Sequence, residues 1–489
     1  MSDPTTFVPP APLLVAEAIR AQAEGRPGTV AVDDGSHALT FAELVAAAAS
    51  VARHARAVGI RLGDRVVVQS SLRSEVFSAW VGLNAVGAVL VPITPKHTEQ
   101  ERAWIQEDCR PVWSIGEADL ERIAVPGVDM LPEPPADLSE LAPALMRYSS
   151  GTTDGRLKGI LLSHRSLVLT FWLEAIEFGH RPGTRLLTSL PWSGAGGFFV
   201  MSMLSVGGGA VLQRTFDTGE WWRLAESSSL TNALVVPTQA VRLVATPPEG
   251  GLRLRTVVST GAPLADTTRE RLAKISGAEV IDCYGATETS VALVRRPIDG
   301  AGAGLGRNAT GARVRVVDEA GAPVADGTLG QIAKRGPDVF SGYWQRPELT
   351  TRLLAGDGFI RTGDIGVRRP DGTLAVADRR EDLILSGGNS IAPAEIENCL
   401  LHLDGVTEAA VVGVSDPDLG ERVVAVLVTS RELSVEEVLA HCGNRLAAYK
   451  LPRQVEFRAE LPVNAAGKVV RRRLRKELGD RSDGERAGS

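Results

Sequence analysis

Apolar runs of strand length alternate with helical patterns of apolar residues from residue 13 to about residue 300. Thr40–Glu43 has the sequence of a capping box, and after it apolar residues recur at helical spacing up to Val51. The β-branched run Val66–Val68 predicts a short buried strand. Thr267–Glu270 predicts the start of a helix between two later strands. Runs of the same kind as Val66–Val68 follow at Ala233–Pro237, Thr256–Ser259 and Glu279–Asp282. Strands that alternate with helices predict a parallel sheet flanked by helices.

The pattern changes twice in the second half of the chain. From about 310 to 378, short strands separated by Asp and Gly turns predict a small antiparallel barrel or meander. A second mixture of helices and strands follows, with a helix over Ala394–Leu403 and another after the capping box Ser434–Glu437. We therefore predict an α/β fold with a large amino-terminal domain at 1–378, a hinge at 379–382, a small mobile α+β domain at 383–478 and a disordered tail at 479–489.

The composition is that of a globular protein and narrows the cellular context. The 489 residues are 44% hydrophobic and 23% charged with a formal net charge of −6, so the overall charge does not favour nucleic-acid binding. Four cysteines are too few for a disulfide framework, and Met1–Thr6 lacks the basic and then apolar order of a secretory signal. The most apolar stretch, Ala79–Ile93, is shorter than the roughly 18 residues of a membrane span. We expect a cytoplasmic protein without a membrane span; its oligomeric state, monomer or homodimer, stays open.

The densest polar motif is Tyr148–Gly159, which holds hydroxyls, glycines and one lysine within twelve residues. Glycines let the backbone approach a ligand, and hydroxyls and an ammonium add hydrogen-bond donors, which suits the oxygens of a polyphosphate. The segment lacks the Gly-x4-Gly-Lys pattern of a Walker A loop. A flexible surface loop has a similar composition, so this segment alone leaves both interpretations open.

Further motifs decide between these interpretations. With Tyr148–Gly159 they make the sequence resemble the adenylate-forming superfamily, which includes acyl-CoA synthetases, the adenylation domains of peptide synthetases and luciferase-like ligases. The resemblance extends from Thr40 to Lys468, with the motifs in the family's order. These further motifs are Ser259–Leu264, Tyr284–Glu288, Gly336–Trp344, Asp357–Asp364, Asp378–Asp382, Ser386–Glu397 and Leu461–Lys468.

The resemblance implies roles for residues around ATP. Tyr284 would stack on adenine, Thr287 would contact the α-phosphate and Glu288 would hold Mg²⁺, a hard cation that prefers oxygen ligands. Asp364 would accept both ribose hydroxyls, and Arg379 would reach the ribose or a phosphate. The implied nucleotide-binding set is Ser149, Ser150, Gly151, Thr152, Thr153, Lys158, Gly261, Ala262, Pro263, Asp282, Cys283, Tyr284, Gly285, Thr287, Asp364, Arg379 and Lys468. Tyr284, Glu288 and Asp364 could instead be ordinary turn residues.

The resemblance also implies a moving domain. Lys468 would reach the active site for adenylation, because a carboxylate that attacks the α-phosphate brings two anions together. A thiol must then attack the acyl-adenylate from an open face, so the small domain would rotate about Glu381. Gly387 and Gly388 would then line the tunnel of the incoming CoA. Lys468 could instead be one more surface cation, and Glu381 a solvated linker charge.

The acid that is activated is specified less clearly. Pro191–Gly194 replaces the Pro-x-x-His of many fatty-acid and aryl-acid relatives, and no aspartate there could pair with an α-ammonium. Small residues leave volume and aromatic residues make its wall apolar, so we expect a bulky fatty, cyclic or aryl acid with an uncharged tail. Close packing of glycines would give the same sequence. The expected acyl pocket consists of Trp192, Ser193, Gly194, Gly197, Gly261 and Ala286.

The leading hypothesis is an enzyme, an ATP- and Mg²⁺-dependent ligase that forms acyl-adenylate and pyrophosphate and then transfers the acyl group to CoA. The alternatives are a ligase that loads the phosphopantetheine of an acyl carrier protein, and a non-catalytic nucleotide-binding protein. The chain departs from the family's pattern in the phosphate loop, which has one extra residue between Thr153 and Lys158 and Leu157 where proline is common. Gln331 replaces a frequent glutamate, and Leu385 stands where a lysine or another polar residue is often found.

Overall fold

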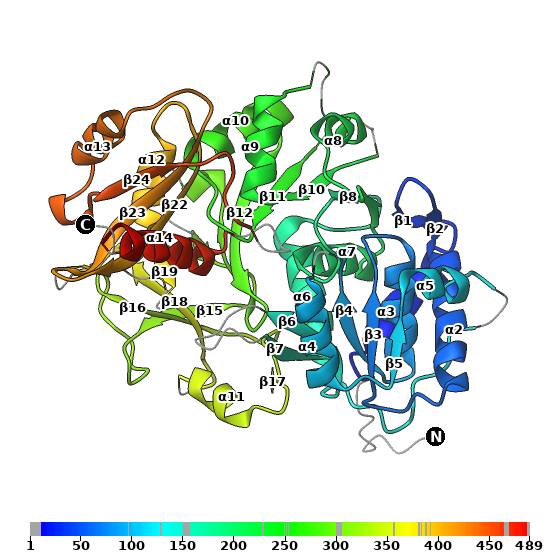
Figure 1. The fold of residues 1–489 in the computed structure, drawn as a ribbon. Helices are drawn as coiled ribbons and strands as arrows, with labels where there is room; N and C mark the ends of the chain where they lie inside the picture. The colour runs from blue at the N-terminus through cyan, green and yellow to red at the C-terminus, as the bar shows by residue number, and fades with distance from the viewer. Residues whose placement is uncertain are drawn as a thin grey trace. The chain divides into compact units, whose positions relative to one another are not determined.

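The chain folds into two compact units that both combine sheets with helices (Figure 1), which confirms the α/β class. Residues 1–215 with 337–350 belong to the first unit, and 216–336 with 351–489 to the second. The structure, a computed structural model, describes residues 11–486 apart from 96, 128–129, 150–156, 227–228, 249, 251, 253, 300–305, 356, 380–381, 383, 387–388, 392 and 464–468. In that part of the chain, no helix has the length and apolar character needed to cross a membrane.

The first unit holds the six-stranded sheet, four strands of the nine-stranded sheet and seven complete helices among the residues described. Its helices are α1 (Val15–Gly25), α2 (Phe41–Ala57), α3 (Glu75–Ala85), α4 (Glu99–Cys109), α5 (Glu117–Ile123), α6 (His164–Phe178) and α7 (Ala195–Ser205). Its strands are β1 (Val30–Asp33), β2 (Ala38–Thr40), β3 (Arg65–Gln69), β4 (Val89–Ile93), β5 (Trp113–Ile115), β6 (Pro143–Ser149), β7 (Lys158–Ser163), β8 (Arg185–Thr188), β9 (Gly209–Leu212) and β17 (Gly342–Tyr343).

The sequence predicts the start of this unit well. Thr40 and Glu43 form the expected capping box of α2, and the apolar stretch 79–93 is helix α3 followed by strand β4. Every residue of α3 and of β4 is buried. In the six-stranded sheet, β3 pairs in parallel with β4 and β5, and β4 pairs in parallel with β6. Helices and strands that alternate in this way form the predicted parallel arrangement.

The segment Gly336–Trp344 falls within the range 310–378 predicted as a barrel or meander, but its strand does not join the four-stranded antiparallel sheet. Gly342 and Tyr343 form β17, which pairs with β7 at the end of the six-stranded sheet. Main-chain bonds continue this pairing on both sides, from Ser341 N–H to the Leu161 carbonyl and from Trp344 N–H to the Gly159 carbonyl, both 2.8 Å. The segment therefore supports the strand that leaves the predicted phosphate loop.

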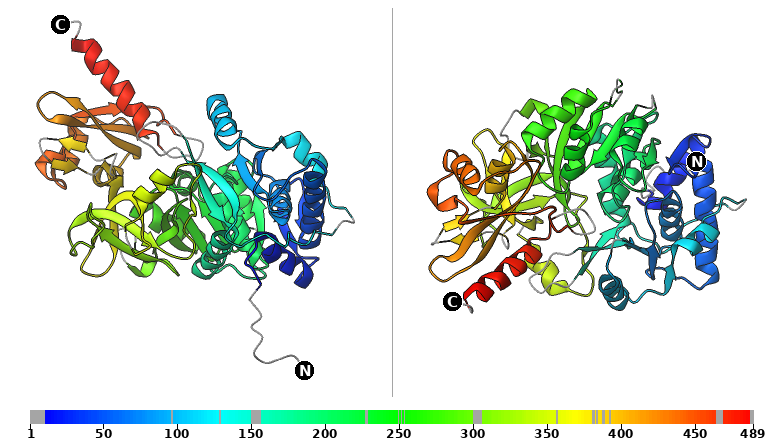
Figure 2. Two further views of the ribbon diagram at one scale, coloured as in Figure 1. Left: turned by 90° about the horizontal axis from the view of Figure 1, so that it is seen from below. Right: turned by 45° about the horizontal axis from the view of Figure 1, so that its top comes forward.

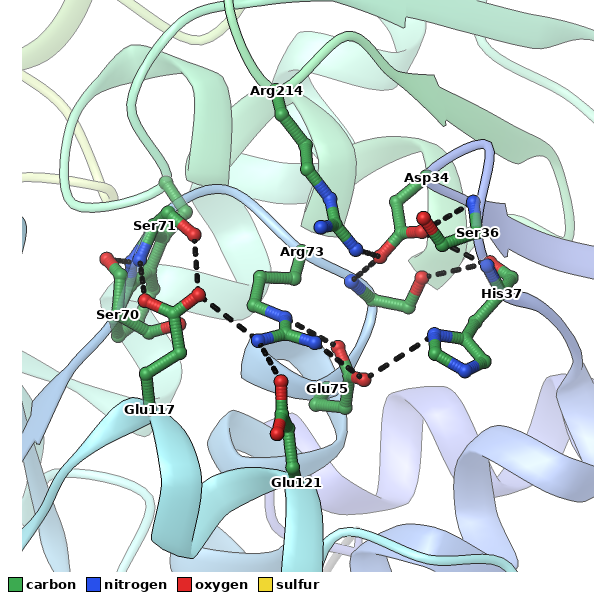
Figure 3. A network of polar contacts seen from close by, with 12 residues as sticks. Asp34, Ser36, His37, Ser70, Ser71, Arg73, Glu75, Glu117, Glu121 and Arg214 are labelled. Atoms are coloured by element: carbon green, nitrogen blue, oxygen red, sulfur yellow. Dashed lines mark hydrogen bonds and ion pairs between the residues drawn. The ribbon is translucent and has the colours of Figure 1, made fainter.

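A polar network stabilises the loops at one end of this unit (Figure 3). Arg73 is 5% exposed and forms ion pairs with Glu75 at 3.2 Å, Glu117 at 2.9 Å and Glu121 at 2.5 Å. Asp34 is buried beside it and accepts main-chain hydrogen bonds from Ser36, His37 and Ser74, with Arg214 at 3.3 Å. Burial alone would raise the pKa of Asp34, but these donors and Arg214 lower it to about 2. The network joins the turn after β1 to the loop after β3 and to α5.

The second unit contains the rest of the chain. Its helices are α8 (Thr218–Ala225), α9 (Pro237–Ala245), α10 (Asp266–Ser276), α12 (Pro393–Leu401), α13 (Val435–Gly443) and α14 (Arg471–Arg486), and α11 (Pro347–Leu353) crosses the boundary between the units. Its strands are β10 (Asn232–Val235), β11 (Thr256–Thr260), β12 (Glu279–Ala286), β13 (Ser290–Arg295), β14 (Arg307–Asn308), β15 (Arg313–Val317), β16 (Leu329–Arg335), β18 (Ile360–Arg368), β19 (Leu374–Arg379), β20 (Ile384–Ser386), β21 (Asn389–Ile391), β22 (Val406–Asp416), β23 (Gly420–Thr429) and β24 (Gln454–Phe457).

Three predicted strands lie next to one another in this unit. β10, β11 and β12 pair in parallel, and β12 then turns back into the antiparallel β13. Helix α10 lies between β11 and β12 in sequence as expected, but it begins at Asp266 with Ala265 as N-cap and has no side-chain cap. The helix start predicted at Thr267–Glu270 is therefore wrong, because Thr267 is already the second residue of the helix.

The region predicted as a barrel or meander is a four-stranded antiparallel sheet in the order β15, β16, β18, β19. After it, β20 to β24 form a five-stranded sheet with α12 and α13, and Ser434 and Glu437 form the expected capping box of α13. Leu474 and Leu478 of α14 pack with buried valines of β22 and β23. This helix is continuous to Arg486 (Figure 2), whereas the sequence predicts a disordered tail from 479. The ion pair between Arg473 and Glu477, at spacing i, i+4, is one local reason for the helix.

Candidate active site

The two ends of the predicted phosphate loop are fixed to each other and to α4. Ser149 on β6 pairs with Lys158 on β7, while Ser150, Gly151, Thr152 and Thr153 lie outside the described residues. At the first end, the Tyr148 hydroxyl donates to the Asp108 carboxylate at 2.7 Å. At the other end, the carbonyl of Leu157 accepts from Trp104 Nε1 at 3.2 Å and from Arg346 at 3.3 Å. Arg346 also pairs with Asp108 at 2.9 Å, so one ion pair connects both ends.

Lys158 is held beside an aromatic ring. Its Nζ lies 5.1 Å from the centre of the Tyr343 ring on β17, within the range of a cation–π interaction. Through this contact, the motif Gly336–Trp344 touches the lysine at the end of the predicted phosphate loop. Sequence reasoning did not select Asp108, Trp104 or Arg346; only Arg346 had a sequence clue, because it follows that motif by two residues.

In the second unit, three residues predicted to bind the nucleoside come together. The Tyr284 hydroxyl donates to the carboxylate of Asp364. Asp364 is 8% exposed, and its main-chain N–H donates to the Thr362 hydroxyl at 3.1 Å. Arg379 faces Asp364 directly in the ladder between β18 and β19. An aromatic residue, a carboxylate and the backbone of an arginine therefore share one place in this unit.

Thr287 and Glu288 lie in the turn between β12 and β13. The turn is closed by hydrogen bonds between the Ala286 N–H and the Thr289 hydroxyl at 3.2 Å and between the Thr289 N–H and the Ala286 carbonyl at 3.1 Å. Lys334 on β16 is completely buried, and its Nζ donates to the carbonyls of Thr289 and Val291. The ammonium thus fixes the strand that follows Glu288. The sequence gives no clue to this role, because an isolated lysine in a strand usually predicts an exposed side chain.

Asp282 anchors a neighbouring loop rather than exposing its carboxylate. It is 2% exposed, and its Oδ2 accepts from the Leu264 N–H at 3.2 Å. Burial raises the pKa of Asp282 to about 7, although the Leu264 N–H, Arg295 and Arg269 oppose the rise. The anchored loop contains Gly261, Ala262 and Pro263, all exposed, with Gly261 at φ +90°, a conformation that favours glycine. Of the other predicted residues on β12, Cys283 is buried and Gly285 is exposed.

Two residues predicted for the acyl pocket belong to the core instead. Trp192 is 1% exposed, and its Nε1 donates to the Ser70 carbonyl at 2.9 Å. A Cβ on Gly197 would lie 1.9 Å from the Trp192 carbonyl oxygen, so this glycine permits close packing and leaves no open volume beside it. Ser193 and Gly194 are partly exposed and stay candidates for the pocket.

The residues on either side of 464–468 pair with each other in the second unit and form a short stem. Lys468, Glu381, Gly387 and Gly388 lie outside the described residues. The hairpin stem is described: Val463 pairs with Val469, and the Val470 N–H donates to the Pro462 carbonyl at 2.8 Å. Directly after the stem, Arg471 binds both carboxylate oxygens of Glu397 at 2.9 and 2.8 Å and contacts Asp382 at 3.4 Å. Asp382 follows the predicted hinge residue, so this cluster connects the hinge to the stem.

Comparison with known proteins places the chain in a family. A family model described as AMP-binding enzyme matches residues 19–344, and one described as AMP-binding enzyme C-terminal domain matches residues 395–468. The chain belongs to the AMP-binding enzyme family. The members of the adenylate-forming superfamily that resemble it support the predicted class: it is an AMP-forming acyl-CoA synthetase that activates a carboxylic acid with ATP and transfers the acyl group to CoA.

Individual relatives match over almost the whole length. A sulfoacetate–CoA ligase from Cupriavidus necator is 33% identical, with 97% of this chain and 98% of the relative covered. A feruloyl-CoA synthase from Amycolatopsis sp. is 32% identical over 93% of this chain and 96% of the relative. Among solved structures, ATP-bound MatB from Rhodopseudomonas palustris is similar with a TM-score of 0.87 at 28% identity, covering 96% and 99% of the two chains.

Proposed function

We propose that Tyr284, Asp364 and Arg379 hold the nucleoside of ATP and that the phosphate loop holds its phosphates. The carboxylate of the acid attacks the α-phosphorus, the bond from that phosphorus to the bridging oxygen of pyrophosphate breaks, and acyl-adenylate forms. The observation that carries the proposal is the contact of the Tyr284 hydroxyl with Asp364, opposite Arg379 in the ladder. These groups suit a nucleoside, because a ring can stack on a base and a carboxylate can accept ribose hydroxyls.

Mg²⁺ is part of this proposal, with Glu288 as its protein ligand. The fit rests on donor chemistry: a carboxylate in a tightly hydrogen-bonded turn offers the hard oxygen that Mg²⁺ prefers. The described residues contain no group of three or more His, Cys, Asp or Glu side chains that could hold a metal. The remaining ligands would therefore be phosphate oxygens and water. Bound Mg²⁺ would neutralise phosphate charge, while Thr287 contacts the α-phosphate.

Lys468 supplies the cation between the two reacting anions. Adenylation gathers negative charge on the α-phosphate and on the attacking carboxylate, so an ammonium placed there lowers the barrier. The thiol of CoA then attacks the acyl carbon, the bond from that carbon to the AMP oxygen breaks, and AMP leaves. This step needs an open face, so the small domain rotates about Glu381 and brings Gly387 and Gly388 to the thiol.

The experiment measures pyrophosphate and AMP formation by the purified chain with ATP, Mg²⁺ and a panel of carboxylic acids that includes sulfoacetate and ferulate. We expect pyrophosphate release that depends on the acid, and a thioester when CoA is added. A holo-carrier protein in place of CoA tests the alternative acceptor. A chain that forms no pyrophosphate with any acid would contradict the proposal. Omission of Mg²⁺ and substitution Glu288→Gln should each reduce adenylation strongly.

A cytoplasmic location belongs to the same proposal. All four cysteines are buried and free, which suits a reducing compartment. Fractionation of expressing cells, with detection of the full chain, would test this location.

A further inference from the structure

A guanidinium lies beside Gly194, one of the residues expected to form the acyl pocket. Arg147 is on β6, two residues before Ser149, and its side chain is partly buried. Its guanidinium carbon lies 5.0 Å from the centre of the Phe198 ring on α7. One of its terminal nitrogens lies 3.9 Å from the position that a Cβ of Gly194 would occupy. The Arg147 guanidinium therefore lies next to Gly194, at a position where relatives with a larger residue would place a side chain.

The aromatic surroundings fix the position of this cation. Phe198 is 8% exposed and makes edge contacts with Trp80 and Phe171, at ring-centre distances of 6.1 and 6.3 Å. The ring cannot move without disturbing this cluster, so it provides a rigid face on which the guanidinium stacks. A partly buried guanidinium on a rigid face is suited to bind a carboxylate or sulfonate through two parallel hydrogen bonds.

We propose that Arg147 is a specificity-determining residue that binds a second anionic group on the acid, so the substrate is a carboxylic acid with a further carboxylate or sulfonate. The inference rests on the proposed function, because it assumes that the acid lies beside Gly194. It differs from the uncharged tail predicted from the sequence, which considered the small and aromatic residues of the pocket but not the adjacent strand. Arg147 is close enough to the phosphate loop that an ATP phosphate is the competing anion.

The test compares acids that differ only in the second charge. Each dicarboxylic or sulfo-carboxylic acid, in a series with increasing separation of the two groups, is paired with its neutral monoamide or sulfonamide of the same shape. For the wild-type chain we expect lower KM in the adenylation step for the charged member of at least one pair. The variant Arg147→Met keeps the length and apolar contact of the side chain, and should raise KM for that acid about 10- to 100-fold.

Controls separate specificity from other roles of Arg147. KM for ATP, KM for the neutral amide and the melting temperature should stay nearly unchanged in Arg147→Met, and Arg147→Lys should recover part of the discrimination. An increase in KM for ATP with unchanged discrimination would assign Arg147 to a phosphate and overturn the inference. A wild-type preference for the neutral acids would also overturn it. A chain that adenylates no acid at all would instead overturn the proposed function, and the inference with it.

Discussion

Single residues differ in how far the sequence specifies their roles. Tyr284 and Asp364 belong to recognisable motifs, and the structure places them in contact. Arg147 and Lys334 were not selected, because their roles depend on partners far away in the sequence, Phe198 for one and the turn at 289–291 for the other. Trp192 and Gly197 were selected for the pocket, but composition cannot distinguish a pocket wall from close packing.

Asp282 should make the stability of the protein depend on pH. Its folded pKa of about 7 is higher than the ordinary value of an aspartate, so between about pH 4 and pH 7 the folded chain retains a proton that the unfolded chain has lost. Its contribution to stability therefore falls as the pH rises through this window. Asp282→Asn keeps an acceptor for the Leu264 N–H without the charge.

We expect the Asp282→Asn variant to melt about 2 °C or more above the wild type at pH 8 and at nearly the same temperature at pH 4. Thermal unfolding of both chains across this range measures the difference. Asp371→Asn is the control with the opposite sign, because hydrogen bonds from Thr373 lower the pKa of Asp371. A wild type that is more stable than Asp282→Asn at pH 8 would show that Asp282 acts as a stabilising carboxylate.

Elements were predicted well where periodicity and capping agree, as in α2 and α13. They were predicted less well where tertiary contacts decide. β17 consists of two residues and exists through its pairing with β7. The cap proposed for α10 has the right composition, but Thr267 is already the second residue of the helix. α14 extends beyond the expected end, in a segment whose polar composition alone indicates disorder.

The ion pair between Arg471 of α14 and Glu397 of α12 should stabilise the fold more than the other ion pairs of α14. Arg471 is 17% exposed and Glu397 15%, and Glu397 also accepts from the Val411 N–H at 2.8 Å. Arg471→Met removes the guanidinium that pairs with Glu397 and contacts Asp382. We therefore expect a loss of about 1–3 kcal/mol in the free energy of unfolding of the small domain. Adenylation should also slow, because the stem that carries Lys468 loses its anchor.

Arg473→Met is the matched control in α14. Arg473 pairs with Glu477 at 2.8 Å, but its side chain is 69% exposed, so its loss should cost at most about 0.5 kcal/mol. Urea unfolding and the rate of pyrophosphate release report on both variants. Equal effects of the two substitutions would mean that Arg471 does not anchor the stem.

At the scale of the whole molecule, the sequence motifs anticipated the family and the class of reaction, and both are confirmed by the comparisons. The division at 378–382 and the rotation of the small domain stay predictions. They follow from the chemistry, because adenylation and thiol attack need different groups at one position. Sequence patterns cannot establish the acid, since its recognition depends on side chains such as Arg147 that meet only after folding.

The most direct test of the account measures the two half-reactions separately in the variant Lys468→Ala, with Arg472→Ala as the control for general loss of positive charge. Pyrophosphate release from ATP and acid reports adenylation, and thioester formation from supplied acyl-adenylate and CoA reports the second step. We expect Lys468→Ala to lose adenylation by at least about 100-fold and to retain most thioester formation, while Arg472→Ala retains both. Equal loss of the two half-reactions in Lys468→Ala, or no loss in either, would contradict the account.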